Sequence, residues 1–583
     1  MSDHSRDIRV VRGVPSSGVG QPQVSLRTRR NVMMPMRDGV LLAMDILIPS
    51  LPGPFPVILV RTPYNKVAVL SSPRGRPFLE RLARSGYVVA VQDCRGRFNS
   101  DGDFDPYRQE PKDGFDTIEW LAQQEWCDGN VGTIGASYNG QTQWLAASQA
   151  PEALKAIVPT VSPPGHPFLN EPFWGGIMLM AAPEWMYAMG RRSDLMVSMQ
   201  RVYTQEQAYL DKLPIGRISE AVGTDLPWWR DWLSHPVYDD YWRSHGYEES
   251  WPRMRVPALN ITGWWDMNFL GAPRNFVGMR KSGATREARE GQRLIIGPWA
   301  HWVNHVTALS GVDFGPGALT DLDGYTVDFF DYWLRGRANG LDREAPVHVF
   351  VIGANEWWEA DEWPLPGTQY RNFFLHSNGN ANTHRGDGLL SLAPPDREPP
   401  DQYVSDPTDP VRILWTLHDG PVDDRALSAR PDVLCYTSEV LEAPLDVVGP
   451  VRAVLYASSS ARDCDWHIRL VDVDPSGVSR FLCHGALRAR FRNGYESATF
   501  LEPGRVERFD IDMTAAGVRF LRGHRIRIEI SSTWFSRFER NPQTASLNWM
   551  TDTSSPVTAH QSVYHDSTFA SCVSLPIISE PPQ

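Results

Sequence analysis

The sequence predicts an α/β fold followed by a β-sandwich, and three patterns carry that prediction. Over the first part of the chain, short apolar runs alternate with helical periodicity, which is typical of a parallel sheet buried on both faces. Residues 163–250 interrupt this alternation with a segment rich in Met, Trp and Tyr. After residue 345, short alternating segments separated by turn residues are typical of a sandwich such as a jelly roll.

The elements follow in chain order. Arg37-Asp38-Gly39 is a hairpin turn between strands expected at Val32–Met36 and Val40–Ile48. The later strands are continuous apolar runs, and the helices repeat their apolar residues at helical spacing. Strands are expected at Val57–Val60, Tyr87–Val91, Val131–Ile134, Leu154–Val158, Ala258–Ile261 and Arg293–Ile296. Helices are expected at Phe78–Ser85, Asp113–Gln124, Gln141–Gln149, 193–212, 226–234 and Asp321–Arg335.

These patterns divide the chain into four parts. Residues 1–26 are polar, lack periodicity and are expected to form a tail. The α/β core comprises 27–162 and 251–344, and the segment between its two parts, 163–250, is a helical cap insertion. Residues 345–583 form the C-terminal jelly-roll β-sandwich.

Composition excludes several classes of protein. The 583 residues are 42% hydrophobic and 22% charged, which argues against disorder, and the net charge is −12 without a basic run. A nucleic-acid partner is therefore not expected, and the absence of a long apolar stretch excludes a transmembrane helix. The polar N-terminus and six scattered cysteines favour a cytoplasmic protein with reduced thiols, and no membrane partner is expected.

A serine between a short strand and a helix is the strongest chemical signal. In Gly135-Ala136-Ser137-Tyr138-Asn139-Gly140, the context fits a nucleophile elbow, where a sharp turn projects the serine hydroxyl above the sheet. The N-terminus of the following helix offers free N–H groups to a developing oxyanion. The strict Gly-x-Ser-x-Gly spacing is not met, so an ordinary strand-to-helix turn is the alternative.

Two further residues fit the chain order of a catalytic triad, which in α/β-hydrolases is serine, acid, histidine. Asp266 and His301 each follow a predicted buried strand, at the sheet edge where open α/β folds bind ligands. They are the candidate acid and base for the nucleophile Ser137. A helix cap is the alternative for Asp266 and a hydrogen-bonded loop residue for His301, while Asp239 and Asp240 are competing acids.

Two segments resemble metal-binding motifs, but each lacks a glutamate that its motif requires. His301 and His305 have the spacing of a zinc-binding helix, but Trp302 occupies the place of the glutamate in H-E-x-x-H. The run that begins at Asp101 resembles a calcium loop, but Lys112 stands at its twelfth position in place of glutamate. No metal or organic cofactor is expected.

Aromatic residues near the candidate triad could line a substrate pocket for an apolar or aromatic group. Trp265 and Phe269 flank the candidate acid, Trp302 follows the candidate base, and Phe173 and Trp174 lie early in the insertion. Plain packing is the alternative for each of them.

With these residues, the chain resembles the α/β-hydrolase family of bacterial cocaine esterase and the X-prolyl dipeptidyl aminopeptidases. The displaced glycine of the elbow, Gly-x-Ser-Tyr-x-Gly, is this family's own pattern. The other matching segments run almost from end to end: Met34-Pro35-Met36-Arg37-Asp38-Gly39-Val40, Val60-Arg61-Thr62-Pro63-Tyr64-Asn65-Lys66, Gln92-Asp93-Cys94-Arg95-Gly96, Trp126-Cys127-Asp128-Gly129-Asn130-Val131-Gly132, Gly263-Trp264-Trp265-Asp266 and Gly297-Pro298-Trp299-Ala300-His301.

The resemblance implies a hydrolase core, a helical insertion and a C-terminal jelly roll. It implies a nucleophile at Ser137, a triad acid at Asp266 and a base at His301. The hydroxyl of Tyr64 and the backbone N–H of Tyr138 are similar to the family's oxyanion-hole donors. The reaction needs no cofactor.

The substrate is expected to be a small-molecule ester or amide, cleaved through an acyl-enzyme. The first expectation is an acyl esterase, and the alternatives are a dipeptidyl-peptidase or α-amino acid ester hydrolase, and a β-lactam side-chain acylase. The peptidase-like activities need a carboxylate for the substrate's ammonium group, and Glu171, Glu184, Asp239 and Asp240 are open candidates. A carbohydrate-binding protein with a vestigial core is a further alternative, and a homo-oligomer is left open.

Overall fold

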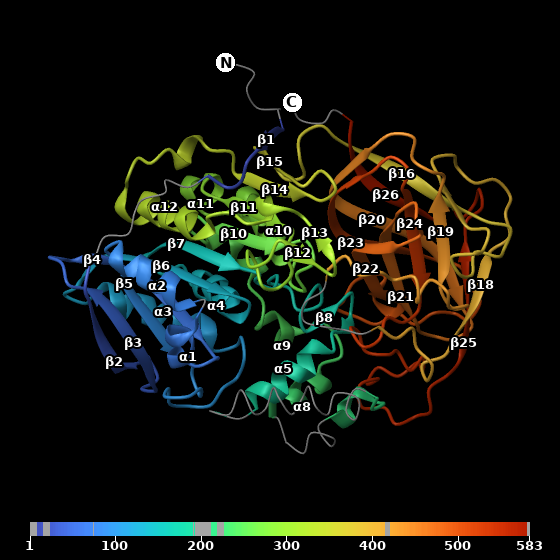
Figure 1. Ribbon diagram of the computed structural model, residues 1–583. Helices are drawn as coiled ribbons and strands as arrows, with labels where there is room; N and C mark the ends of the chain where they lie inside the picture. Colours follow the sequence, from blue (N-terminus) through green and yellow to red (C-terminus); the bar gives the residue numbers. More distant parts are fainter. Residues whose placement is uncertain are drawn as a thin grey trace.

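The computed structural model describes residues 8–15, 24–73, 75–190, 192, 211–218, 227–413 and 420–579. Figure 1 shows two sheet-containing bodies side by side: an α/β body, coloured blue to yellow-green, and a second body in orange and red. Helices α5 (Ala181–Met189), α8 (Pro227–Ser234) and α9 (Asp240–Arg243) lie below and between them. No helix among these residues is both long and apolar enough to span a membrane.

The α/β body is built on an eleven-stranded sheet in the order β1-β15-β14-β11-β10-β7-β6-β4-β5-β3-β2. Neighbouring strands from β5 across to β14 are parallel, and the strands at both edges are antiparallel. The strands are β1 (Arg9–Val11), β2 (Leu26–Pro35), β3 (Leu41–Pro49), β4 (Phe55–Thr62), β5 (Val88–Asp93), β6 (Cys127–Ala136), β7 (Leu154–Thr160), β10 (Leu259–Gly263), β11 (Arg293–Gly297), β14 (Val347–Val351) and β15 (Glu356–Ala360).

Helices cover both faces of this sheet, which explains why its central strands are continuous apolar runs. Successive side chains of β4 point to opposite faces: Val57 joins the apolar cluster that contains residues of α3 and α4, and Ile58 joins the one that contains residues of α2 and α12. The helices of this body are α1 (Lys66–Ser71), α2 (Gly75–Arg84), α3 (Glu110–Ala122), α4 (Tyr138–Ala147), α10 (Gly271–Ser282), α11 (Arg286–Glu290) and α12 (Leu322–Arg335).

The second body is mostly sheet, as expected, in the order β18-β25-β20-β26-β16-β17-β19-β24-β21-β22, with β23 paired to β20. All pairs are antiparallel except β17 with β19. Its strands are β16 (Thr368–His376), β17 (Leu389–Ser391), β18 (Asp401–Ser405), β19 (Leu434–Ser438), β20 (Leu445–Ser459), β21 (Asp465–Val473), β22 (Ser479–Arg488), β23 (Glu507–Phe520), β24 (Arg525–Ser531), β25 (Ala559–Tyr564) and β26 (Cys572–Ile578).

The structure differs from the expected boundaries in three places. Strand β1 lies within the expected tail and pairs with β15, and it is too short to show periodicity in the sequence. Strands β14 and β15 extend the first sheet beyond residue 344. The short alternating segments that begin after residue 345 therefore do not mark the end of that sheet. The insertion also contains a buried hairpin, β8 (Phe173–Trp174) and β9 (Ile177–Met178), where no strand was expected.

The remaining helices follow the sequence pattern. The helix predicted at 226–234 appears as α8. Most of the helix predicted at 193–212 lies outside the described residues.

A buried guanidinium ties the insertion to the second sheet. Arg488 is fully buried and donates to both carboxylate oxygens of Asp465, each at 2.9 Å, and to Oε1 of Glu539 at 2.8 Å. The same Glu539 oxygen accepts the backbone N–H of Met178 in β9 at 3.0 Å. One cation therefore bridges two buried carboxylates, and Glu539 in turn fixes the hairpin of the insertion against the second body.

We expect Arg488→Leu to lower the free energy of unfolding by about 3–5 kcal/mol, because two carboxylates would be left buried without their cation. Urea unfolding, followed by tryptophan fluorescence, measures this loss. The matched control is Arg508→Leu, which removes an exposed ion pair with Asp510 and should cost less than about 1 kcal/mol. Equal losses in the two variants would contradict the role of the buried network.

Candidate active site

Ser137 occupies the sharp turn between β6 and α4. Its backbone has φ 60° and ψ −126°, a conformation that costs a residue with a side chain on the order of 1–3 kcal/mol. The backbone N–H of Ser137 donates to the carbonyl of Thr160, at the end of β7, at 2.9 Å. The neighbouring strand therefore holds the turn in its strained form, which is the backbone of a nucleophile elbow.

The glycine spacing of the elbow follows from close approaches on both sides. A Cβ at Gly135 would lie 2.5 Å from Cβ of Asn139, and a Cβ at Gly140 would lie 2.8 Å from Cβ of Ser162. No side chain fits at either position without a shift of its neighbours. The second glycine is therefore required three residues after the serine, where α4 passes the chain that leaves β7.

Asp266 and His301 meet at the carboxyl edge of the sheet. Asp266 follows β10 and His301 follows the adjacent strand β11, and Oδ1 of Asp266 accepts from Nδ1 of His301 at 2.8 Å. The hydroxyl of Thr262 donates to Oδ2 of Asp266 at 3.0 Å, and the side chain of Asp266 is fully buried. Because Nδ1 of His301 is held by the carboxylate, Nε2 is the ring nitrogen left for proton transfer.

Opposing effects set the protonation of His301. Burial lowers the pKa of the imidazole, but the hydrogen bond and the charge of Asp266, together with the charge of Glu171, raise it above its ordinary value. Two carboxylates thus stabilise the imidazolium that forms when His301 takes a proton.

The hydroxyl of Tyr64 lies beside the serine. Tyr64 follows β4, and the side chain of Ser137 acts on the pKa of its hydroxyl. It accepts from Nε1 of Trp185, on helix α5, at 3.0 Å. Burial raises the pKa of Tyr64 well above its ordinary value, so the phenol stays neutral and can donate a hydrogen bond. Nothing in the sequence points to Trp185, because no local pattern separates it from the other tryptophans of the insertion.

A buried network fixes Tyr138, the first residue of α4. Its hydroxyl donates to Oε1 of Glu110 at 3.0 Å and accepts from the backbone N–H of Tyr107 at 3.0 Å. Glu110 pairs with Arg61 at 2.6 Å, and both side chains are buried. The side chain of Tyr138 therefore points into the core, and its backbone N–H stays at the N-terminus of α4 next to Ser137.

Glu171, one of four candidate carboxylates in the insertion, is electrostatically coupled to the site. Burial raises its pKa to about 7, and the neighbouring charge of Asp266 adds to this rise. The charge of His301 and a hydrogen bond from the hydroxyl of Tyr107, at 3.3 Å, oppose it. Glu171 therefore changes its charge close to neutral pH.

The other three carboxylates have different surroundings. Asp239 caps α9 by accepting two of its first N–H groups, and Asp240 is nearly fully exposed and pairs with Arg243. Glu184 is buried within α5. These contacts of the competing acids Asp239 and Asp240 lie within the insertion, whereas Asp266 contacts His301.

Two of the aromatic candidates are buried in packing contacts. The ring of Phe173 packs against Phe168 and Trp242, with centroids 4.6 and 5.3 Å apart. The ring of Phe269 stacks on Trp264 at 5.5 Å. Both side chains are at most 3% exposed.

The other three aromatic candidates face different parts of the molecule. Trp265 donates from Nε1 to the carbonyl of Phe481 in the second body at 3.3 Å. Trp174 lines a separate pocket at the junction of the two bodies. Trp302 is half-exposed, and its ring lies 6.4 Å from that of His301. Of the five predicted aromatic walls, Trp302 is the one whose ring the structure brings beside His301.

A serine at a strand-to-helix elbow, beside a His–Asp pair at the carboxyl edge of a largely parallel sheet, is the arrangement of the α/β-hydrolases. Within the described residues, no group of three or more His, Cys, Asp or Glu side chains could hold a metal ion.

Comparison with known proteins identifies the family. The profile of the X-Pro dipeptidyl-peptidase (S15 family) matches residues 38–303, and that of the X-Pro dipeptidyl-peptidase C-terminal non-catalytic domain matches residues 339–574. Cocaine esterase from Rhodococcus sp. (strain MB1 Bresler) is 37% identical over 574 residues, which are 94% of this chain and 98% of the relative. The chain therefore belongs to the hydrolase family of cocaine esterase and the X-Pro dipeptidyl-peptidases, which confirms the resemblance seen in the sequence.

Two solved structures share the whole architecture. An aminopeptidase from a marine sediment archaeon, Thaumarchaeota archaeon, has a TM-score of 0.83 at 26% identity and covers 97% of this chain and 99% of its own. An α-amino acid ester hydrolase has a TM-score of 0.82 at 26% identity and covers 96% of this chain and 98% of its own.

We expect Asp266→Asn to lower the pKa of His301, because burial then acts on the imidazole without its carboxylate partner. NMR titration of the protein labelled at histidine Cε1 measures the change, with the signal assigned by its loss in His301→Gln. The control is Asp239→Asn, which changes a carboxylate of the insertion and should leave the titration of His301 unchanged. An unaltered His301 titration in Asp266→Asn would contradict the coupling.

Proposed function

We propose that this protein is a serine hydrolase that cleaves carboxylic esters, with Ser137 as nucleophile, His301 as base and Asp266 as the acid that orients it. The observation that carries the proposal is the 2.8 Å contact between His301 and Asp266, at the sheet edge that also carries the strained Ser137. The chain order of the three residues is that of the α/β-hydrolases. Membership of the family of cocaine esterase supports an ester as substrate.

The reaction proceeds through an acyl-enzyme. Oγ of Ser137 attacks the ester carbonyl while Nε2 of His301 takes its proton, and Asp266 stabilises the resulting imidazolium. The tetrahedral intermediate collapses when the imidazolium gives this proton to the leaving alkoxide. Water, deprotonated by His301, then attacks the acyl-enzyme. The acyl–serine bond breaks, the acid is released, and the imidazolium returns its proton to Oγ of Ser137.

The oxyanion is bound by the hydroxyl of Tyr64 and the backbone N–H of Tyr138. Support for Tyr64 comes from its place beside Ser137 and from the N–H of Trp185, which occupies a lone pair of the phenol and leaves its proton free to donate. Support for Tyr138 comes from the Glu110 network that fixes its side chain. Removal of one such donor typically slows catalysis by about 10²–10³-fold.

The insertion and Trp302 also contribute to this site. The insertion acts as a cap, since it supplies Trp185 and Glu171, and Trp302 forms one wall of the acyl or alcohol pocket. We assign a jelly-roll topology to the second sheet because its strand pairs, such as β16 with β26 and β18 with β25, join segments far apart in sequence.

A fluorophosphonate probe tests the nucleophile without knowledge of the substrate. We expect intact-mass spectrometry to find one adduct on the wild type and none on Ser137→Ala, with hydrolysis of p-nitrophenyl esters near background in the variant. The control variant Ser162→Ala changes a serine of the neighbouring loop and should still react. Equal labelling or equal turnover in Ser137→Ala would overturn the proposal.

A second candidate function is hydrolysis of α-amino acid esters. Such substrates carry an ammonium group, and Glu171 is a carboxylate whose charge is coupled to those of His301 and Asp266. The likeness to the α-amino acid ester hydrolase, over nearly the whole of both chains, supports this candidate. When ionised, Glu171 would pair with the ammonium group.

The test of this candidate compares an amino acid ester with its analogue that lacks the amino group. We expect Glu171→Gln to lower kcat/KM about 10–100-fold for the amino ester and by much less for the analogue, because a charge-assisted hydrogen bond is lost. Glu184→Gln, a buried carboxylate of the same insertion, is the control. Equal losses for the two esters would assign Glu171 a structural role and favour the simple acyl esterase.

A further inference from the structure

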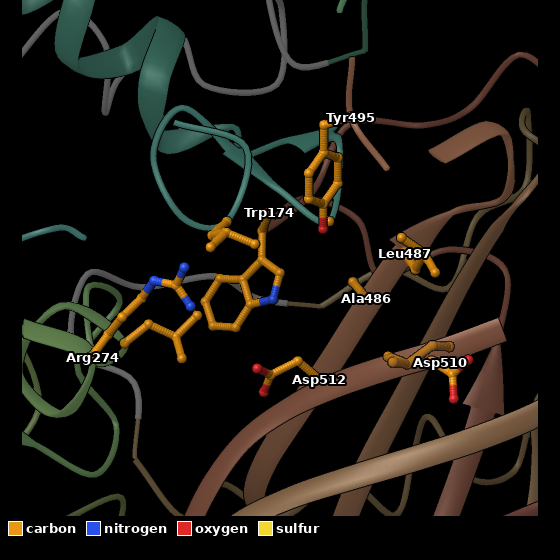
Figure 2. A pocket seen from close by; sticks show the side chains of 11 residues that line it. Trp174, Arg274, Ala486, Leu487, Tyr495, Asp510 and Asp512 are labelled. Atoms are coloured by element: carbon orange, nitrogen blue, oxygen red, sulfur yellow. The ribbon is translucent and has the colours of Figure 1, made fainter. Parts of the chain in front are cut away.

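A pocket lies where the core, the insertion and the second sheet meet. It is partly open, has a volume of about 90 Å³, and none of Ser137, Asp266 and His301 lines it. Figure 2 shows the side chains that point toward this space. They are Leu169, Trp174, Gly175, Leu270, Arg274, Ala486, Leu487, Tyr495, Asp510, Ile511 and Asp512.

Two aromatic rings border the pocket. Trp174 is buried against the imidazole of His484 and the ring of Phe538, with ring centroids 4.3 and 6.2 Å apart, and it also lines the pocket. Tyr495 comes from the opposite wall, and Figure 2 shows its hydroxyl directed toward Trp174. An aromatic face carries a partial negative charge and attracts cations.

Ion pairs neutralise two of the three charged side chains of the pocket. The guanidinium of Arg274 donates to both carboxylate oxygens of Glu248, each at 2.7 Å. The carboxylate of Asp510 pairs with Arg508 at 2.6 Å. These side chains therefore leave little net charge at the walls.

Asp512 differs from both. Its carboxylate accepts the backbone N–H of Thr514 at 2.8 Å, but no basic side chain among the described residues forms an ion pair with it. Arg452 is its partner in the strand register, and both Arg452 and Arg274 lie in its field without such a contact. Figure 2 shows Asp512 and Arg274 on different sides of Trp174. The pocket thus combines aromatic walls with one carboxylate that has no direct ion pair among the described residues.

We propose that this pocket binds a small organic ammonium ion with an apolar body. The cation would lie between the carboxylate of Asp512 and the ring of Trp174, an arrangement that draws on both charge attraction and the aromatic quadrupole. The side chains of Leu270, Leu487 and Ile511 would contact the apolar body. This binding site is separate from the hydrolytic one, so it does not depend on the proposed nucleophile.

Isothermal titration with choline and with its uncharged isostere 3,3-dimethyl-1-butanol tests the proposal. We expect choline to bind the wild type at least about 10-fold more tightly than the isostere, a preference worth about 1.4 kcal/mol. Asp512→Asn should remove this preference, since it keeps the shape of the side chain and deletes its charge. The matched variant Asp510→Asn, two residues away on the same strand, should change choline affinity by less than about 2-fold, because its charge is already paired.

A third variant separates the two sites. Glu171→Gln removes the carboxylate beside His301, so a loss of choline binding in this variant would place the cation in the hydrolytic site and overturn the proposal. Absence of binding to the wild type at concentrations up to about 100 mM choline would overturn it as well. If Asp512→Asn has native circular dichroism and still prefers choline to its isostere as strongly as the wild type does, the proposal is also overturned.

Discussion

The positive φ angle of Ser137 is the constraint on which the α/β body depends. A serine does not hold this conformation by itself, so the neighbouring structure must impose it. Thr160 fixes the turn from β7, Gly135 and Gly140 allow the backbones to approach, and the side chain of Tyr138 is anchored below by Glu110. Together these contacts hold the backbone of Ser137 in its strained turn.

Two carboxylates that act on His301 differ in their hydrogen bonds. Asp266 has a donor on each oxygen, from His301 and Thr262. Glu171 has one longer contact, with Tyr107, and burial raises its pKa to about 7. The site thus contains one carboxylate held in place by two donors and another whose charge responds to pH near neutrality.

The sequence revealed what local rules determine. A buried strand followed by a polar residue marks the carboxyl edge of a sheet, and this rule located Asp266 and His301, which the structure brings into contact. Side-chain direction does not follow from such rules. Trp265 adjoins Asp266 in sequence, yet it faces the second body, while Trp185 reaches Tyr64 from a distant helix. Contacts of this kind arise from packing between remote segments, as does the pairing of β1 with β15.

The hairpin β8–β9 has a consequence for the synthesis of the protein. Its strand β9 exchanges backbone hydrogen bonds with residues 537–539, some 360 positions later in the chain, and Glu539 also accepts the N–H of Met178. The insertion is made early, but it cannot complete these bonds until nearly all of the chain has left the ribosome. A nascent chain that already contains Ser137, Asp266 and His301 therefore still lacks residues 537–539, which bind this hairpin in the finished structure.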